Sequence, residues 1–352
     1  MELSDLGFDE WFAAHGAELE VDGCCFARIS AVDRGAYLIM RNASTEVTAK
    51  LPGKLTYQMG NSIEKPCVGD WVTAEYHDND TAATIRRVFP RRTFLRRKVA
   101  GRRTRAQMIA VNVDTAFVVQ SCHFDFNLSR LERYLIMATD GNVEPIVLLT
   151  KTDLVTPEQL DQRLATVRSI TRARVIALSN VTGIGFDEFQ QTLAPGRTYC
   201  LLGSSGVGKT TLINRLMGHD AFETRAVSDT GEGVHTTSRR QLIVLNQGAM
   251  LIDTPGMREI GIVGAGDGVD TGFEDLVALA AECRYADCSH EHEPGCAVKA
   301  AVEKGELDEG RYFNYLKLKK ESEYTEMSYR DKRKKDRAFG RFIKSAKKRK
   351  KR

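Results

Sequence analysis

Nine consecutive residues have the pattern of a loop that binds phosphate groups. They match the G-x-x-x-x-G-K-[ST] motif at every fixed position: Gly203, Ser204, Ser205, Gly206, Val207, Gly208, Lys209, Thr210 and Thr211. The glycines of such a loop let backbone N–H groups point inward, and the following helix N-terminus adds positive charge. Lys209 is predicted to contact the β- and γ-phosphates, and the Thr210 hydroxyl is predicted to bind Mg²⁺. This chemistry fits a nucleoside triphosphate.

A second motif discriminates between the bases. It resembles the guanine-reading N-K-x-D element and consists of Thr150, Lys151, Thr152 and Asp153, with threonine in place of asparagine. Guanine offers N1–H and N2–H as neighbouring donors and adenine does not, so the Asp153 carboxylate favours GTP. The aliphatic stem of Lys151 can pack over the base. An ATP-dependent enzyme is the alternative, against which Asp153 argues.

A third motif predicts the residues that bind Mg²⁺ and the γ-phosphate. Asp253-Thr254-Pro255-Gly256 resembles the D-x-x-G element, in which Asp253 holds Mg²⁺ through its water shell and the Gly256 N–H meets the γ-phosphate. The glycine-rich residues 231–237 are the switch candidate. Either Thr236 or Thr237 is expected to cap Mg²⁺ when the γ-phosphate is present, so Thr237 joins Lys209 among the predicted catalytic residues.

The residue that follows Gly256 indicates slow intrinsic hydrolysis. Ras-like enzymes have a glutamine there that orients the attacking water, whereas this chain has Met257. A thioether cannot orient water, so another group must act. His235 is the catalytic candidate because imidazole can orient or deprotonate water. A purely structural role of His235 in the switch is the alternative.

Four residues near the C-terminal end have the spacing of a zinc site. Cys283, Cys288, His290 and Cys296 lie within 14 positions and complete a Cys₃His ligand set. Four protein ligands leave no open position, so the predicted Zn²⁺ is structural. His292 is a spare that could replace His290.

These motifs require an α/β domain in an unusual order. Strands alternate with helices from Ala110, which favours a mostly parallel sheet covered on both faces. The guanine element precedes the phosphate loop, and Asp253–Gly256 comes last, so the GTPase order is circularly permuted. Whatever follows is therefore attached directly behind the second switch.

The flanking segments indicate an RNA partner. Five short strands are expected at 24–32, 37–41, 46–51, 71–76 and 83–88, which suits a small closed barrel of the OB or SH3-like type. Residues 81–113 hold ten Lys and Arg and no acid, and residues 330–352 hold 14 against two acids. Because the whole chain has a net charge of only +4, the residues outside these two zones carry a net negative charge. Two concentrated basic zones in an otherwise acidic protein favour a polyanionic partner. The part of the first zone between Arg91 and Arg105 is expected to form a linker or exposed arm.

Taken together, the chain resembles the ribosome small-subunit-dependent GTPase A family (RsgA), over about residues 20–340. The resemblance implies a GTP-hydrolysing factor in late maturation of the small ribosomal subunit, which binds ribosomal RNA and is activated by the subunit. The family's proposed catalytic histidine falls on His235. Thr150, Val234 and Asn180 depart from the family pattern. An RNA-binding scaffold whose GTP site is only a sensor is the alternative of another class.

The predicted organisation has five parts. They are an N-terminal helical extension (1–20), an OB-fold barrel (21–92), a basic linker (93–109), the permuted GTPase domain (110–272) and a zinc-binding domain with a basic helical tail (273–352). No apolar run approaches membrane-spanning length, and the N-terminus lacks the build of a signal peptide. We therefore expect a cytoplasmic protein without membrane contact, and a monomer by default.

Overall fold

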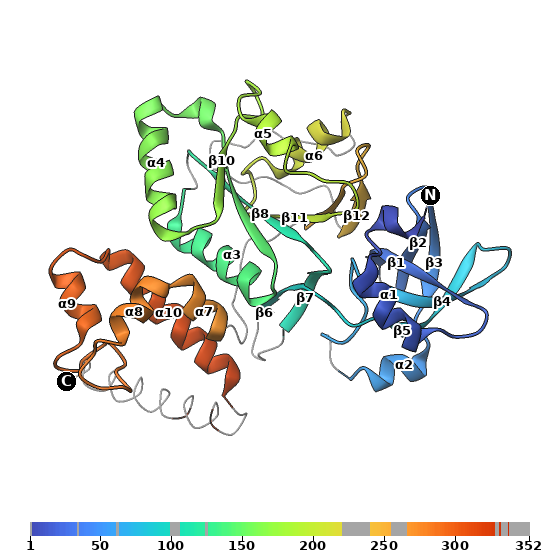
Figure 1. Ribbon diagram of the computed structural model, residues 1–352, viewed down its shortest axis with the longest axis horizontal. Coiled ribbons are helices and arrows are strands. Elements are labelled where there is room, and N and C mark those ends of the chain that lie inside the picture. Colours follow the sequence, from blue (N-terminus) through green and yellow to red (C-terminus); the bar gives the residue numbers. More distant parts are fainter. Residues whose placement is uncertain are drawn as a thin grey trace, which may run out of the picture. The chain divides into compact units, whose positions relative to one another are not determined.

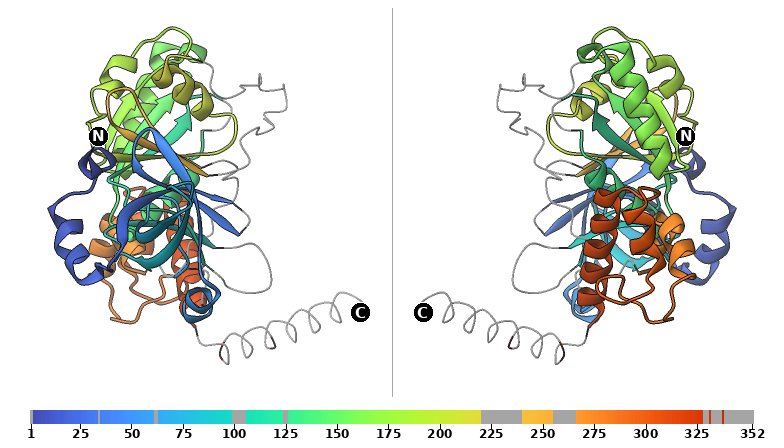
Figure 2. Two further views of the ribbon diagram at one scale, coloured as in Figure 1. Left: turned by 90° about the vertical axis from the view of Figure 1, so that its right-hand side faces the viewer. Right: turned by 90° about the vertical axis from the view of Figure 1, so that its left-hand side faces the viewer.

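The computed structural model describes residues 2–33, 35–60, 63–98, 106–123, 126–219, 240–254 and 266–327, together with Asp331 and Arg337. The chain divides into two compact units, Met1–Ile260 and Gly261–Arg352. Figures 1 and 2 show the first unit in blue to light orange and the second in deeper orange to red. The predicted boundaries of the five parts stay predictions.

The first part of this unit, after a short N-terminal segment, is a closed five-stranded barrel. Its strands confirm the five predicted ones to within a residue or so: β1 (Cys24–Asp33), β2 (Ala36–Asn42), β3 (Thr45–Lys50), β4 (Trp71–His77) and β5 (Ala82–Val88). The barrel closes because β1 pairs with both β2 and β4, while β3 pairs with β5. Helix α2 (Gly53–Gln58) lies between β3 and β4. This is the barrel class expected for an OB-fold.

The second part of this unit is a doubly wound α/β sheet. Its strands run in the order β10 (Arg174–Ala177), β9 (Glu144–Thr150), β8 (Thr115–Ser121), β11 (Thr198–Leu202), β13 (Met250–Asp253) and β12 (Gln241–Val244). The first five are parallel, and β12 pairs antiparallel with β13. The carboxyl ends of the parallel strands therefore meet at one edge, where ligands bind in such sheets.

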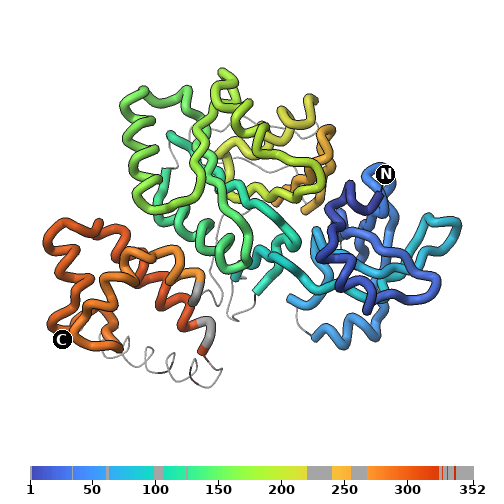
Figure 3. Tube along the Cα trace, viewed as in Figure 1, coloured from blue at the N-terminus to red at the C-terminus, as the bar shows by residue number. Residues whose placement is uncertain are grey.

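Helices cover both faces of this sheet (Figure 3). One apolar core joins the sheet to α3 (Leu128–Asp140) and α4 (Pro157–Ile170), and a second joins it to α5 (Phe186–Gln190) and α6 (Lys209–Met217). Strand β8 contributes to both cores: Val118 packs in the first, and its neighbours Phe117 and Val119 pack in the second. Alternate residues of a strand point to opposite faces, so a continuous apolar run serves two layers.

The barrel and the α/β sheet are hydrogen-bonded into one sheet of 11 strands. Ala31 on β1 pairs with Gln241 on β12. The N-terminal segment packs at the same junction through a 3₁₀ turn (Leu3–Leu6), α1 (Glu10–Gly16) and a second 3₁₀ turn (Ala17–Leu19). Buried Arg28 donates to the carbonyl oxygens of Leu6 at 2.6 Å and Asn112 at 3.0 Å. Its burial lowers the pKa of Arg28 to about 10.

The first basic zone differs from the expected linker. The predicted linker, residues 93–109, overlaps two strands that pair with each other as a hairpin, β6 (Phe94–Lys98) and β7 (Ala106–Val111). Leu95 and Ile109 are fully buried, and Arg96 forms an ion pair with Asp140 at 3.0 Å. The apolar residues between the arginines thus form a buried face of the hairpin, which the high charge of this segment does not predict.

The second unit is helical over its described residues. It consists of α7 (Gly266–Gly272), α8 (Glu274–Ala280), α9 (Ala297–Glu303) and α10 (Glu309–Glu326). The buried Phe273 ring lies 5.3 Å from that of Tyr315, and Arg311 pairs with Asp275 at 2.7 Å. Within the described part of the chain, no helix is both long enough and apolar enough to cross a membrane.

Candidate nucleotide site and metal centre

The phosphate loop has the backbone that its glycines predict. It connects β11, which ends at Leu202, to α6, which begins at Lys209. Gly203, Gly206 and Gly208 have φ angles of 154°, 80° and 98°, which L-residues rarely adopt. A Cβ on Gly203 would also lie 2.4 Å from the Val119 carbonyl oxygen. The loop shape therefore needs glycine at its first position for two independent reasons.

The predicted triphosphate contacts lie at this loop. The Lys209 ammonium group donates to the carbonyl oxygens of Gly203 at 2.8 Å and Ser204 at 2.6 Å, and its side chain is buried. Thr210 is half-buried at the start of α6. A cation and a hydroxyl are thus fixed at the helix N-terminus, where a phosphate and its Mg²⁺ are favoured.

The guanine element follows β9 at the same edge of the sheet. Lys151 has left-handed backbone angles (φ 58°, ψ 40°), and Thr152–Leu154 then forms a 3₁₀ turn that exposes Asp153. The Ser179 hydroxyl donates to Asp153 Oδ1 at 2.5 Å. Ser179 Oγ also accepts the N–H groups of Val181 and Thr182, each at 3.1 Å. Since both its lone pairs are engaged, its one hydrogen points to Asp153.

This Ser179 contact was not predicted. A contact across 26 positions leaves no local pattern in either segment, so the sequence alone does not indicate it. The structure brings Ser179 against the Asp153 carboxylate.

Thr150 has a role that the N-K-x-D comparison does not reveal. It is fully buried, and its hydroxyl donates to the carbonyl oxygen of Val207 at 2.7 Å. Val207 belongs to the phosphate loop. This hydrogen bond therefore ties the segment that contains the predicted guanine element to the predicted phosphate loop.

Asp253 lies at the end of β13, which is parallel to β11. Its side chain is buried, and the neighbouring Thr254 hydroxyl donates to the Leu201 carbonyl oxygen at 2.7 Å. The start of the D-x-x-G element is thus fixed beside the phosphate loop. The remaining predicted residues lie outside the described part of the chain: His235, Thr236, Thr237, Gly256 and Met257.

The four predicted zinc ligands come together in the second unit. The ligand atoms of Cys283, Cys288, His290 and Cys296 all lie within 4.8 Å of one another. Cys283 Sγ is 3.9 Å from Cys296 Sγ, and His290 Nδ1 is 3.6 and 3.5 Å from these two sulfurs. Tetrahedral Zn²⁺ with usual bond lengths separates sulfurs by about 3.8 Å and sulfur from nitrogen by about 3.5 Å. The residues fit a zinc ion.

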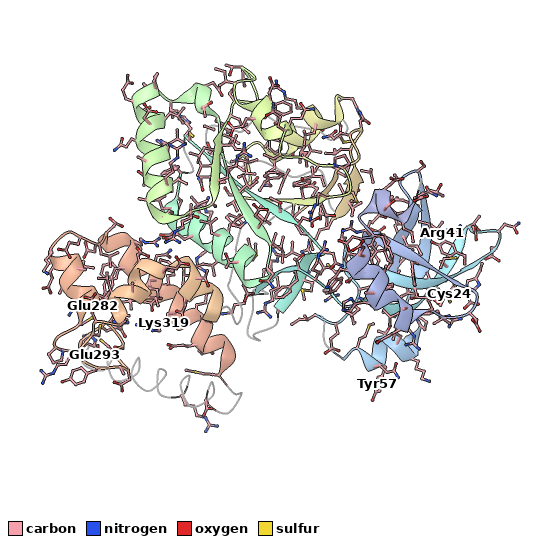
Figure 4. All side chains as sticks on the ribbon, in the orientation of Figure 1. Cys24, Arg41, Tyr57, Glu282, Glu293 and Lys319 are labelled. Atoms are coloured by element: carbon pink, nitrogen blue, oxygen red, sulfur yellow. The ribbon has the colours of Figure 1, made fainter. Side chains whose placement is uncertain are left out.

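The surroundings select His290 over His292. His290 is buried in the left-handed region (φ 63°), and its carbonyl oxygen accepts from the Tyr312 hydroxyl at 2.7 Å. Burial lowers the pKa of His290, which favours the neutral form that binds metal. His292 is exposed. Glu293, labelled in Figure 4, accepts from the Ser289 hydroxyl at 2.6 Å and braces the loop between the ligands.

Comparisons with known proteins agree with this geometry. A family model described as RsgA GTPase matches residues 88–263. The chain is 41% identical over 335 residues to the small ribosomal subunit biogenesis GTPase RsgA of Opitutus terrae, covering 92% of this chain and 90% of that protein. It is 42% identical over 311 residues to small ribosomal subunit biogenesis GTPase RsgA 2 of Lactiplantibacillus plantarum, covering 88% and 86%.

Solved structures agree on the fold. The crystal structure of YjeQ from Thermotoga maritima matches with a TM-score of 0.62 at 25% identity, over 85% of this chain and 98% of that one. YloQ, a circularly permuted GTPase, matches with a TM-score of 0.57 at 24% identity, over 88% and 98%. The barrel, the permuted order and the extent of the matches lead to one assignment: the chain belongs to the RsgA GTPase family.

Proposed function

We propose that this protein hydrolyses GTP during maturation of the small ribosomal subunit. The observation that carries the proposal is the meeting of three motifs at one edge of the sheet, namely the phosphate loop, the guanine element and Asp253. The names of the most similar relatives, small ribosomal subunit biogenesis GTPases, support the biological role.

Each motif has a defined part in binding. Asp153, oriented by Ser179, accepts the two neighbouring N–H groups of guanine, and the Lys151 stem covers the base. Lys209 and the loop N–H groups hold the β- and γ-phosphates. Thr210 and the water shell at Asp253 hold Mg²⁺, which neutralises the charge that develops during phosphoryl transfer.

We propose that the attacking water is activated by a group other than residue 257. Met257 offers no group that orients water, so His235 or a group supplied by the subunit performs this step. Thr237, or its neighbour Thr236, is proposed to complete the Mg²⁺ shell in the GTP state. Slow hydrolysis in isolation and acceleration on the subunit follow from this arrangement.

Ribosomal RNA is proposed as the direct partner. Tyr57 on α2 is 89% exposed (Figure 4), and an exposed aromatic ring suits base stacking. In the second unit, residues 266–327 hold 15 Asp and Glu against seven Lys and Arg. The cationic charge needed for phosphates is therefore concentrated in residues 330–352, which makes this tail, rather than the zinc-holding part, the proposed RNA contact there.

The GTP state is proposed to reach the second unit through connectivity. Asp253–Gly256 is followed directly by the chain that enters α7 at Gly266. A movement of the second switch that depends on the γ-phosphate would pull on this connection. Zn²⁺ at the four ligands would keep the receiving unit folded. We further propose a cytoplasmic monomer.

One experiment tests the function. GTP hydrolysis by the full chain is measured alone, with purified small subunits and with an equal concentration of large subunits. The expected result is slow turnover alone and a large acceleration by small subunits only. Unchanged turnover with small subunits refutes the activation. Tight GTP binding without turnover under every condition favours the sensor alternative.

A further inference from the structure

An arginine at the end of α6 packs against the turn that contains Ser179, between β10 and α5. Arg215 lies in the last turn of α6, and its Nη1 donates to the Asn180 carbonyl oxygen at 3.2 Å. Its guanidinium carbon lies 4.0 Å from the centroid of the Phe186 ring. Its Nη2 is so close to Gly183 that a Cβ there would be 2.8 Å away. The guanidinium therefore meets the turn at three places.

The turn is attached to α6 from both sides of this contact. Phe186 is buried in the core that joins the sheet to α5 and α6, so the ring under Arg215 is fixed. Asn180 contacts α6 a second time, because its Nδ2 donates at 3.3 Å to the Gly208 carbonyl oxygen, which also accepts the Leu212 N–H at 3.0 Å. The helix that begins in the phosphate loop thus holds the turn near its first residue and near its last.

The turn passes its position on to Asp153. Ser179 is fully buried, its N–H donates to the Ile184 carbonyl oxygen at 2.9 Å, and its carbonyl oxygen accepts from the Gly183 N–H at 3.0 Å. These bonds across the turn make it move as one body. Because the Ser179 hydroxyl donates to Asp153 Oδ1 at 2.5 Å, a displacement of the turn would displace this donor from the carboxylate.

Two roles of Arg215 differ in what they require of the side chain. A positive charge in the last turn of a helix interacts favourably with the helix dipole, and any cation supplies that. The contacts with the Asn180 carbonyl and the Phe186 ring need a planar guanidinium, which stacks on a ring while it donates in its own plane. We propose that Arg215 is a positioning residue for base recognition, which holds the turn so that Ser179 orients Asp153 toward guanine.

This inference rests on the proposed binding of GTP with Asp153 as the base reader. Loss of the Arg215 contacts should weaken GTP and GDP by the same factor, because both carry guanine. Arg215 is exposed, so one hydrogen bond and one ring contact correspond to about 3- to 10-fold in affinity. The affinity for ATP should stay unchanged, since adenine lacks the donor pair that Asp153 accepts and the phosphate loop is not altered.

The test measures competition of GTP, GDP and ATP with a fluorescent GDP analogue. Arg215→Lys keeps the charge and removes the planar group, and Arg215→Ala removes both. Both variants should bind GTP and GDP about 3- to 10-fold more weakly. The control is Arg168→Lys, the same change at an exposed arginine in the last turn of α4, and it should match the parent. Circular dichroism and melting temperatures establish that each variant is folded.

A double variant tests the route through Ser179. Ser179→Ala removes the bond to Asp153, so adding Arg215→Lys to it should weaken GTP by less than about 2-fold further. Parental affinity for GTP in Arg215→Lys would overturn the proposal, because charge alone would then suffice. An equal loss of ATP affinity, or full additivity in the double variant, would overturn it as well. Failure of the parent protein to bind GTP would instead refute the proposed function, so the two failures are distinguishable.

Discussion

The substitution Asp153→Asn tests whether this carboxylate reads the base, and the structure predicts which way the new amide group will point. Ser179 donates its only hydrogen to Asp153 Oδ1, and an asparagine oxygen can accept that bond equally. Ser179 therefore selects the rotamer in which the amide oxygen takes the Oδ1 position and the NH₂ group replaces Oδ2. In the proposed binding mode the new NH₂ group then faces guanine N2–H, so that two donors oppose each other.

The expected loss follows from counting these contacts. A hydrogen bond to a charged group contributes about 1.5–3 kcal/mol, and a donor left unpaired costs about 1–3 kcal/mol. Removing the carboxylate partner of N2–H and opposing two donors therefore costs about 3–6 kcal/mol, which corresponds to a ~10²- to 10⁴-fold weaker affinity for GTP. Xanthosine triphosphate has a carbonyl at that place, so its affinity should rise as that of GTP falls.

Competition binding of GTP, xanthosine triphosphate and ATP to the parent and the variant measures this. Asp161→Asn, an exposed change of the same type on α4, is the control and should leave all three affinities unchanged. Melting temperatures should agree, because the Ser179 bond persists. Parental selectivity for GTP in the Asp153 variant would show that this carboxylate does not read the base.

Three further predictions concern the loop, the metal and pH. Gly203→Ala should cost about 2–4 kcal/mol of folding free energy and abolish GTP binding, since its Cβ meets the Val119 carbonyl at 2.4 Å; melting curves and GTP titration measure both. A zinc chelator should release about one metal ion per chain and unfold residues 266–327, and Cys296→Ser should have the same effect. Metal analysis measures the bound metal, and hydrogen exchange measures the unfolding. The control Cys25→Ser, at an exposed cysteine, should change neither the metal content nor the exchange rates. Burial alone would raise the pKa of Asp275, but the hydrogen bond and charge of Arg311 bring it below the usual value. Such a depressed pKa stabilises the fold at pH above about 4, and the contribution is lost as pH falls through the folded pKa; urea unfolding at pH 7 and pH 3 should show this loss in the parent and a smaller one in Asp275→Asn.

The features that the sequence predicts are those formed by residues close together in the chain. The phosphate loop is one run of nine residues, and the zinc ligands lie within 14 positions, so spacing alone identifies each set. The five barrel strands were recognisable from their alternation and turn residues. The choice between His290 and His292 needed the structure, because burial and the left-handed backbone at His290 decide it.

The remaining features depend on contacts between distant segments. Neither the Ser179 bond to Asp153 nor the Asn180 bond to Gly208 leaves a pattern in either segment. The many arginines of residues 93–109 predict a linker, whereas the structure has the β6–β7 hairpin there, in which Leu95 and Ile109 are buried. Helix and strand periodicity identifies elements but not which of them share a sheet.

The pairing of β1 with β12 has a practical consequence for dissecting this protein. Strand β12 has β13 on one side and the barrel strand β1 on the other. Deleting residues 1–92 to isolate the GTPase part would remove β1, which pairs with β12 at Gln241, and would leave β12 as an edge strand whose free backbone groups can recruit another chain. Such a truncated protein is expected to self-associate, so its low activity would report aggregation rather than the loss of an RNA-binding barrel. A charged or proline substitution on β12 would be needed before that comparison becomes meaningful.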